Sequence, residues 1–240
     1  MGDTKIEYCT KVWSIITGCT PVSAGCDQCW ASRQIRSGRT PAVHGSTDFS
    51  KITFHPSRLD EPLLWRKPQR VFVCSMGDLF HEDVPNAALS AISVMIRECS
   101  WHTFLILTKR PERMKHYISS INPIRNLWLG VSVESPDYLW RVDHLRQTPA
   151  ALRFISFEPL IADVGKVDLT GISWAIVGAE SGPRRRPCNI EWVRSLKDQC
   201  VAARVPIFIK QASINGKLVK MPSIDGRVWG EIPEGKEPKK

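Results

Sequence analysis

Three cysteines near the start of the chain have a spacing that suits a metal centre. Cys19, Cys26 and Cys29 follow the pattern Cys-x6-Cys-x2-Cys, and Gly18 and Gly25 directly precede the first two. Glycine lets a loop wrap closely around a compact object, and thiolates at this density suit a soft metal ion or an iron–sulfur cluster. On a [4Fe–4S] cluster, three cysteines leave one iron open to a substrate or cofactor. The pattern therefore predicts a [4Fe–4S] cluster on these three thiols.

Two other interpretations of these cysteines stay open. A structural zinc site needs a fourth ligand, which Cys9 or His44 would have to supply. Alternatively, the thiols bind no metal or are redox-active. The other cysteines are scattered, and Cys99 and Cys200 lie in helix-like segments where we expect buried thiols.

A second candidate binding segment follows an apolar run in the middle of the first half. It reads Ser75-Met76-Gly77-Asp78. Glycine permits close approach of a ligand to the backbone, and a carboxylate pairs with an ammonium group. By itself the segment also fits an ordinary turn between a strand and a loop.

Short apolar runs of strand length alternate with helix-like segments along most of the chain. Several runs are apolar nearly throughout, which is typical of parallel strands covered on both faces. The expected strands are 11–17, 70–75, 103–107, 127–133, 152–157, 173–177 and 206–209. The expected helices are 30–37, 86–99 capped by Asn86, 111–117, 137–146, and 190–203 capped by Asn189.

This alternation predicts the α/β class with parallel strands. The two candidate architectures are a full or partial TIM-like (β/α) barrel and an open doubly wound sheet. About seven strands favour the barrel, although no eighth strand is evident. We expect a single domain over residues 1–232, followed by a flexible tail over 233–240 that is rich in Lys, Glu, Pro and Gly.

Polar side chains follow the predicted strands, where folds of this type form their active-site face. These residues are Asp78, Lys109, Arg110, Glu134, Glu158, Glu180, Ser181, Lys210 and Gln211. A run of three arginines after the sixth strand adds guanidinium groups, which bind phosphates through paired hydrogen bonds. The predicted phosphate contacts are Lys109, Arg110, Arg184, Arg185, Arg186 and Lys210. A solvated loop explains the arginine run equally well.

Composition narrows the class of protein. The chain has 240 residues, of which 42% are hydrophobic and 24% charged, as in an ordinary folded domain. No apolar run is long enough for a membrane helix, and the N-terminus has no apolar signal core. We therefore expect a cytoplasmic protein without membrane contact, in which the eight cysteines form no disulfide framework. The net charge of +9 favours an anionic partner, although a solubilising surface bias explains it equally well.

Together, the motifs resemble those of known families. The cysteine loop resembles that of radical S-adenosylmethionine (SAM) enzymes, whose common spacing, Cys-x3-Cys-x2-Cys, has a shorter first gap. Over about residues 10–215 the chain is similar to a three-Cys-motif family of phage and bacterial proteins of unknown function. The matching pieces are Trp13–Cys29, Ser75–Phe80, Thr108–Pro111, Gly130–Glu134, Ser156–Leu160 and Gly178–Gly182.

The resemblance implies a radical-SAM-type barrel in which the open iron binds SAM and one-electron reduction releases a 5′-deoxyadenosyl radical. A flavodoxin- or ferredoxin-type protein would donate the electron. The residues that would hold SAM or orient the substrate are Ser75, Met76, Gly77, Asp78, Glu134, Glu158 and Glu180.

We expect the substrate to be a nucleic acid base or a nucleotide, from the charge and the arginine run. One specific hypothesis, suggested by the phage relatives, is isomerisation of an amino-acid adduct of thymidine during DNA hypermodification. The alternatives are a DNA photoproduct repair lyase and a non-enzymatic nucleic-acid-binding protein that contains zinc or a cluster.

Overall fold

A curled, mostly parallel sheet forms the centre of the computed structural model, which describes residues 4, 6–38 and 44–233. Its eight strands have the order β1-β4-β5-β6-β7-β8-β9-β10, and only β10 runs antiparallel to its neighbour. The bounds are β1 Lys11–Trp13, β4 Arg70–Val73, β5 Thr103–Thr108, β6 Leu127–Ser132, β7 Leu152–Phe157, β8 Trp174–Gly178, β9 Ile207–Ile214 and β10 Lys217–Lys220.

The curl of the sheet follows from contacts across its concave face. Neighbouring strands lie about 4.8 Å apart, so a flat sheet would separate β4 from β9 by about 24 Å. Instead, the ring of Tyr8 lies 6.3 Å from that of Phe72 in β4 and 5.5 Å from that of Phe208 in β9. The sheet is therefore a half-barrel whose interior is filled with aromatic side chains. Strands β1 and β10 form its two unpaired edges among the described residues.

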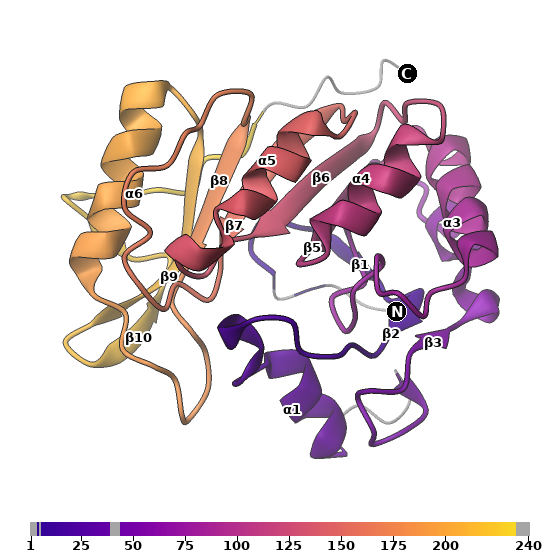
Figure 1. The fold of residues 1–240 in the computed structure, drawn as a ribbon, viewed down its shortest axis with the longest axis horizontal. Helices are drawn as coiled ribbons and strands as arrows, with labels where there is room; N and C mark the ends of the chain where they lie inside the picture. Colours follow the sequence, from indigo (N-terminus) through magenta and orange to yellow (C-terminus); the bar gives the residue numbers. More distant parts are fainter. Residues whose placement is uncertain (1–3, 5, 39–43, 234–240) are drawn as a thin grey trace.

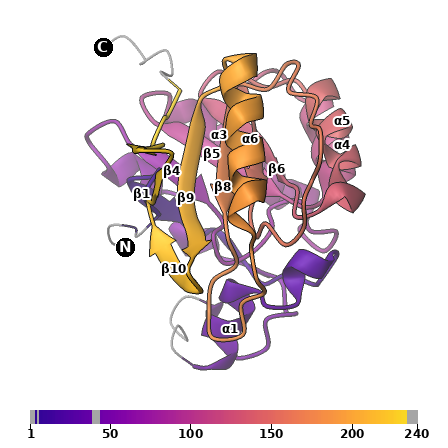
Figure 2. The ribbon, with the colours of Figure 1, turned by 90° about the vertical axis from the view of Figure 1, so that its left-hand side faces the viewer.

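Helices cover the convex face of the half-barrel (Figure 1). They are α3 Asn86–Glu98, α4 Pro111–Ser119, α5 Trp140–Gln147 and α6 Ile190–Ala203. Figure 2 shows α6 beside β8 and β9, against which it packs. Helix α1 (Trp30–Arg36) lies apart from these helices, beyond the carboxyl ends of the strands. Because both faces of the central strands are covered, their side chains are nearly all buried.

The remaining elements are short. The small strands are β2 Ile16–Thr17, β3 Thr53–Phe54, β11 Ser223–Ile224 and β12 Arg227–Val228. The 3-10 helices are η1 Ala24–Cys26, η2 Pro56–Arg58, η3 Glu61–Leu64 and η4 Pro136–Tyr138. No helix within the described ranges is both long and apolar enough to span a membrane.

The expected elements are confirmed except at their ends, where β9 runs to Ile214 and the helix expected over 137–146 begins as η4. Three further differences concern single elements. The first expected strand, 11–17, is divided, because β1 pairs with β4 while β2 turns away to pair with β3. The predicted cap Asn86 is the first helical residue, and Pro85 takes the cap position. The eighth strand, β10, follows β9 as an antiparallel hairpin. Except for Pro233, the expected tail 233–240 lies outside the described residues.

Candidate functional site

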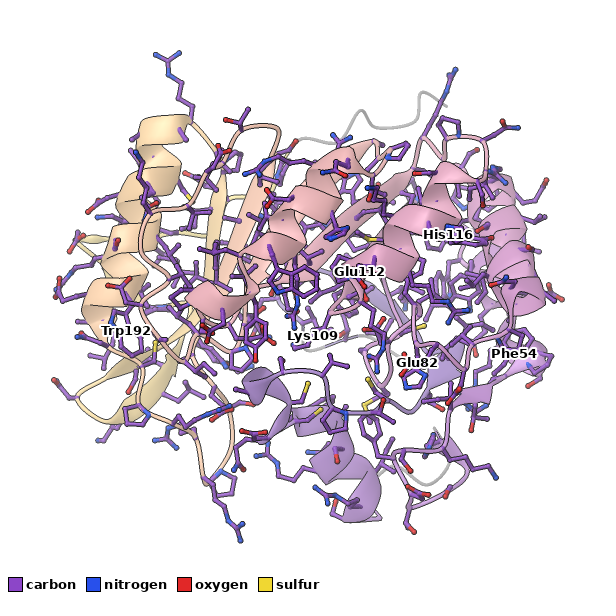
Figure 3. All side chains as sticks on the ribbon, viewed as in Figure 1. Phe54, Glu82, Lys109, Glu112, His116 and Trp192 are labelled. Carbon is purple, nitrogen blue, oxygen red and sulfur yellow. The ribbon has the colours of Figure 1, made fainter. Side chains whose placement is uncertain are left out.

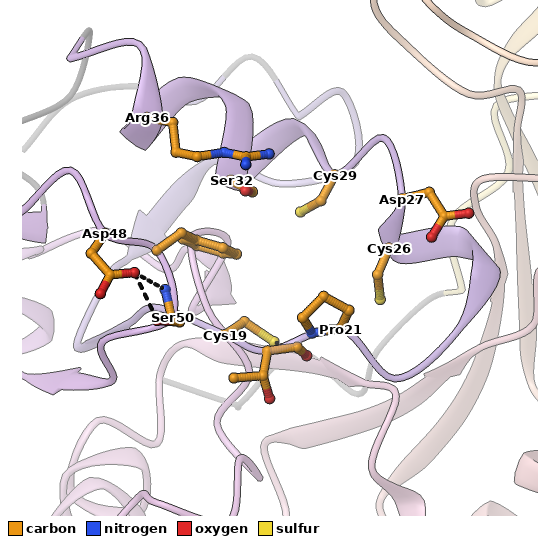
Figure 4. Close-up of a pocket in the computed structure, with 11 residues that line it drawn as sticks. Cys19, Pro21, Cys26, Asp27, Cys29, Ser32, Arg36, Asp48 and Ser50 are labelled. Atoms are coloured by element: carbon orange, nitrogen blue, oxygen red, sulfur yellow. Dashed lines mark hydrogen bonds between the residues drawn. The ribbon is translucent and has the colours of Figure 1, made fainter.

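The three predicted ligands surround one cavity at the carboxyl end of the sheet. Cys19, Cys26 and Cys29 line a space of about 300 Å³ between their loop and α1, which Arg36 and Phe49 also line (Figure 4). These three thiols are half-buried, whereas the other five cysteines are fully buried. The fold thus exposes to one cavity only the cysteines that the spacing singled out.

The donor set fits an iron–sulfur cluster better than a single zinc ion. Within the described ranges, no group of three or more His, Cys, Asp or Glu converges closely enough to bind one metal ion. Sulfur atoms that surround a cavity suit a cluster, in which each cysteine binds a different iron, whereas a structural zinc site has four ligands that converge on one ion. Both ring nitrogens of His44 are hydrogen-bonded, to Thr17 Oγ1 at 2.7 Å and to the Asp48 carbonyl at 2.8 Å. Cys9 is buried among the aromatic side chains of the concave face. Neither predicted fourth zinc ligand therefore reaches the thiols.

The Cys19 end of the loop is held by Arg110, which follows β5. The guanidinium Nη1 of Arg110 donates to Cys19 Sγ at 3.4 Å, and Nη2 donates to the Thr20 carbonyl and hydroxyl at 3.1 and 2.9 Å. Burial raises the pKa of the Cys19 thiol to about 12, and nearby Asp78 adds to this effect while Arg110 opposes it. Because metal coordination deprotonates a thiol outright, the thiolate form of Cys19 would require a bound metal.

Asp78, a predicted contact for the amino group of SAM, is occupied by the protein itself. Its Oδ1 accepts from Thr108 Oγ1 at 2.7 Å and from the Phe80 amide at 3.0 Å. Its Oδ2 accepts from the Lys109 amide at 3.2 Å and from Arg110 Nη1 at 3.4 Å. A carboxylate accepts about four hydrogen bonds. The carboxylate therefore joins the end of β4 to the end of β5, and has no acceptor position left over.

Gly77 brings the end of β4 against the cysteine loop. It forms a parallel bridge with Gly18, whose amide donates to the Met76 carbonyl at 2.9 Å. A Cβ atom at Gly77 would lie 2.9 Å from the Gly18 carbonyl oxygen and 3.0 Å from that of Ile16. Because both contacts are with backbone, only glycine fits this close approach. Met76 packs beneath α1.

Glu134, which follows β6, holds the middle of the loop. Its Oε1 accepts from Ser23 Oγ at 2.7 Å and from Lys109 Nζ at 3.0 Å, and its Oε2 accepts from Arg141 Nη1 at 2.8 Å. Burial raises the pKa of this carboxyl, but Lys109 and Arg141 outweigh it, and the pKa is lowered. In Figure 3, Lys109 lies at the end of the sheet that faces the cysteine loop. Gly25 packs so closely on Glu134 that a Cβ would lie 2.5 Å from Glu134 Cγ.

Arg186 fastens the far side of the loop to Glu180, at the end of β8. Its Nε and its backbone amide donate to Glu180 Oε2 at 3.0 and 2.8 Å, and Nη2 pairs with Oε1. Its Nη1 donates to the Ala24 carbonyl at 2.9 Å and lies 3.6 Å from Asp27 Oδ2. Glu180 and Arg186 thus bind each other and the loop, rather than projecting separately into the cavity.

The other predicted site residues lie outside this set of loop contacts. Glu158 pairs with Lys210 at 2.9 Å and connects the end of β7 to β9. Arg185 donates to the Gly216 carbonyl at 2.8 Å, and the side chain of Arg184 is exposed. Ser75 is half-buried beside Met76.

Sequence reasoning missed several residues that position the loop. Ser23 holds Glu134 and lies 3.6 Å from Cys26 Sγ, and Tyr138 Oη accepts from the Ala24 amide at 3.0 Å. Buried His81 lies 2.8 Å from the Thr20 hydroxyl, and burial lowers its pKa. Ser23 could have been predicted as a site residue, because it lies between two candidate ligands in the sequence. Nothing in the local sequence distinguishes Tyr138 or His81.

The fold and site define a half-barrel α/β protein with three cysteine thiols around one cavity. The chain matches the model of the family described as "Protein of unknown function (DUF5131)" over residues 3–233, and it belongs to this family. A family of unknown function is what the sequence motifs indicated. No curated protein matches the chain. Among solved structures it is similar to a spore photoproduct lyase complexed with dinucleoside spore photoproduct, with a TM-score of 0.48 and 10% identity over 86% of this chain. The chain spans 65% of the length of that structure.

Proposed function

We propose that this protein is a radical SAM enzyme with one [4Fe–4S] cluster on Cys19, Cys26 and Cys29. The observation that carries the proposal is that these three thiols share one cavity, while the other five cysteines are buried elsewhere. Three thiol ligands leave one iron of such a cluster open. When bound and reduced, a cluster of this kind cleaves SAM and supplies a 5′-deoxyadenosyl radical that abstracts hydrogen.

The protein contributes a rigid frame for the cysteine loop. Arg110, Glu134 and Arg186 fasten three separate points of the loop to the ends of β5, β6 and β8. Because the thiols are already held in place, the loop does not have to become ordered when the cluster is assembled. We propose that these three residues, which were predicted to contact SAM or phosphate, organise the metal site.

SAM would bind beside the open iron, along the segment from Ser75 to Gly77. Gly77 places this backbone directly against Gly18, next to the first ligand. The carboxylate of Asp78 is used within the protein, so we assign it the role of shaping this segment. Glu158 and Lys210 form a further charged pair, which joins the end of β7 to β9, and we propose that they line the substrate side of the site.

The substrate that we propose is a nucleic acid base or a nucleotide. The net charge of +9 supports an anionic partner. Of the predicted phosphate contacts, Arg184 is the fully exposed one. Isomerisation of an amino-acid adduct of thymidine is the specific reaction that we would test first, with an electron from a flavodoxin- or ferredoxin-type protein.

The experiment that tests the class measures iron, zinc and SAM cleavage after anaerobic purification. The wild type should hold about four irons per chain and release 5′-deoxyadenosine when dithionite and SAM are added. A triple variant, Cys19→Ala, Cys26→Ala and Cys29→Ala, should lose both properties. The matched control is Cys200→Ala, which removes a buried thiol from α6. One tightly bound zinc and no SAM cleavage in the wild type would refute the proposal.

The substrate class needs a separate test with the loaded protein. DNA that carries the thymidine adduct, ultraviolet-damaged DNA and unmodified DNA are each incubated with reduced protein and SAM, and the bases are analysed by mass spectrometry. Conversion of the adduct alone supports the specific reaction, whereas conversion of the damaged DNA assigns a repair lyase. SAM cleavage with all three DNAs unchanged would refute a DNA substrate.

A further inference from the structure

Arg110 contacts the proposed cluster ligand Cys19 directly, in addition to fastening the loop. Its Nη1 lies 3.4 Å from Cys19 Sγ, and the side chain is 8% exposed. We propose that Arg110 is a positioning residue that raises the reduction potential of the cluster by placing a fixed positive charge on Cys19. This inference rests on the proposed function, because it requires the cluster.

The hydrogen bonds of Arg110 fix its guanidinium in one orientation. Its five N–H groups face Glu82 Oε2 at 2.7 Å, Asp78 Oδ2 and Cys19 Sγ at 3.4 Å each, and the two oxygens of Thr20. Arginine has five donors in a planar fork, so every donor has an acceptor. The Arg110 guanidinium would therefore have to break these hydrogen bonds to rotate away from Cys19 Sγ or to bind a phosphate.

The three thiols differ in their surroundings. Cys19 faces the Arg110 guanidinium, Cys26 has the neutral Ser23 hydroxyl at 3.6 Å, and Cys29 has no side-chain hydrogen bond within the described part of the chain. A buried charge acts through a low dielectric and is screened little by salt. Within the described part of the chain, Cys19 is thus the thiol of the three that accepts a hydrogen bond from a charged side chain.

The direction of the effect follows from charge. Reduction adds one negative charge to the cluster, and hydrogen bonds and positive charge at its sulfurs favour the reduced form. Asp78 and Glu82 offset part of the Arg110 charge. Nevertheless, among the described residues only Arg110 donates to Cys19 Sγ, so its removal should make the potential more negative.

Two glutamine variants separate the charge from the fastening of the loop. Arg110→Gln removes the charge on Cys19. Arg186→Gln is the matched control, because Arg186 also fastens the loop, through the Ala24 carbonyl, without a hydrogen bond to any cysteine sulfur. Iron per chain and the midpoint potential, followed by electron paramagnetic resonance during a redox titration, are measured for both variants and the wild type.

We expect Arg110→Gln to have a more negative midpoint potential than the wild type. We expect the midpoint potential of Arg186→Gln to equal that of the wild type. Equal potentials in Arg110→Gln and the wild type would overturn the inference but leave the proposed function intact. A wild type without a cluster would overturn the proposed function itself. If Arg110→Gln retains no iron on purification, its cluster is reconstituted with iron and sulfide and then titrated: a potential more negative than that of the wild type supports the inference, and an equal potential overturns it.

Discussion

Replacing Glu134 by glutamine tests whether the ion cluster beneath the cysteine loop stabilises the fold. Glu134 is fully buried, and it faces Arg141, which is 1% exposed, and Lys109, which is 20% exposed. Glutamine keeps the shape of the side chain and removes its negative charge. The two cations would then face each other without a carboxylate, with one amide oxygen in place of two carboxylate oxygens, and Arg141 would keep the Ser132 carbonyl at 2.9 Å.

The expected loss is large for a single substitution. Breaking a buried ion pair by removing one partner costs about 3–5 kcal/mol. Lys109 has partial access to water. We therefore expect Glu134→Gln to lower the free energy of unfolding by about 3 kcal/mol, near the lower limit of that range. In urea that corresponds to a fall of about 1 M in the unfolding midpoint. Asp143→Asn is the control, since its pair with Arg146 is exposed and should be worth less than about 1 kcal/mol.

Urea unfolding followed by circular dichroism measures both variants at neutral pH. The double variant Glu134→Met with Arg141→Met should be more stable than Glu134→Gln, because it removes both buried charges of that pair together. If Glu134→Gln is no less stable than Asp143→Asn, the cluster contributes little and the reasoning is wrong.

The pH dependence of this difference has a definite sign. Lys109 and Arg141 outweigh the effect of burial and hold the pKa of Glu134 below its usual 4.5. A lowered folded-state pKa adds stability above the unfolded-state value, and that stability is lost as the pH falls through the folded-state pKa. The gap between wild type and Glu134→Gln should thus be constant above about pH 5 and shrink on further acidification. A gap that widens in acid would contradict this assignment.

Two further substitutions test local features of the fold. Gly77→Ala forces a Cβ against the Gly18 and Ile16 carbonyl oxygens. It should lower the free energy of unfolding by about 1–3 kcal/mol and reduce the iron content. If neither quantity changes, the argument from close approach is wrong. Asn189→Ala removes the helix cap whose side chain accepts from the Glu191 amide at 3.0 Å. We expect thermal unfolding to show a free energy of unfolding lower by about 1 kcal/mol, with the iron content unchanged. A lower iron content would contradict a role confined to the helix.

Most of the elements could be predicted because their signals are local. The cap at Asn189 was predicted correctly, since the side chain and the amide it binds are two residues apart. Asn86 was wrong as a cap, because its Oδ1 instead accepts from Arg113 at 3.3 Å, in a helix that is distant in sequence. The division of the first expected strand also depended on distant partners, β4 and β3.

The contacts of the charged site residues likewise could not be predicted from local sequence. The sequence placed Arg110, Glu134 and Glu180 after strands, and parallel strands bring such positions to one end of a sheet. Their pairing, however, depends on distances between chain segments that only the curled sheet brings together. Ser23 and Glu134, for example, are 111 residues apart in sequence. In the structure these side chains hold the loop, and their contacts with SAM or phosphate stay predictions.

The three candidate ligands and the class of fold could be predicted from local sequence. Cys19, Cys26 and Cys29 lie within one short loop, so their proximity needs no long-range contact, and the strand–helix alternation is periodic along the chain. The tertiary structure alone decided that these thiols share a cavity and that Arg110 lies on Cys19. The physical reason is that charge pairing acts over a few ångströms in space, and distance along the chain does not predict it.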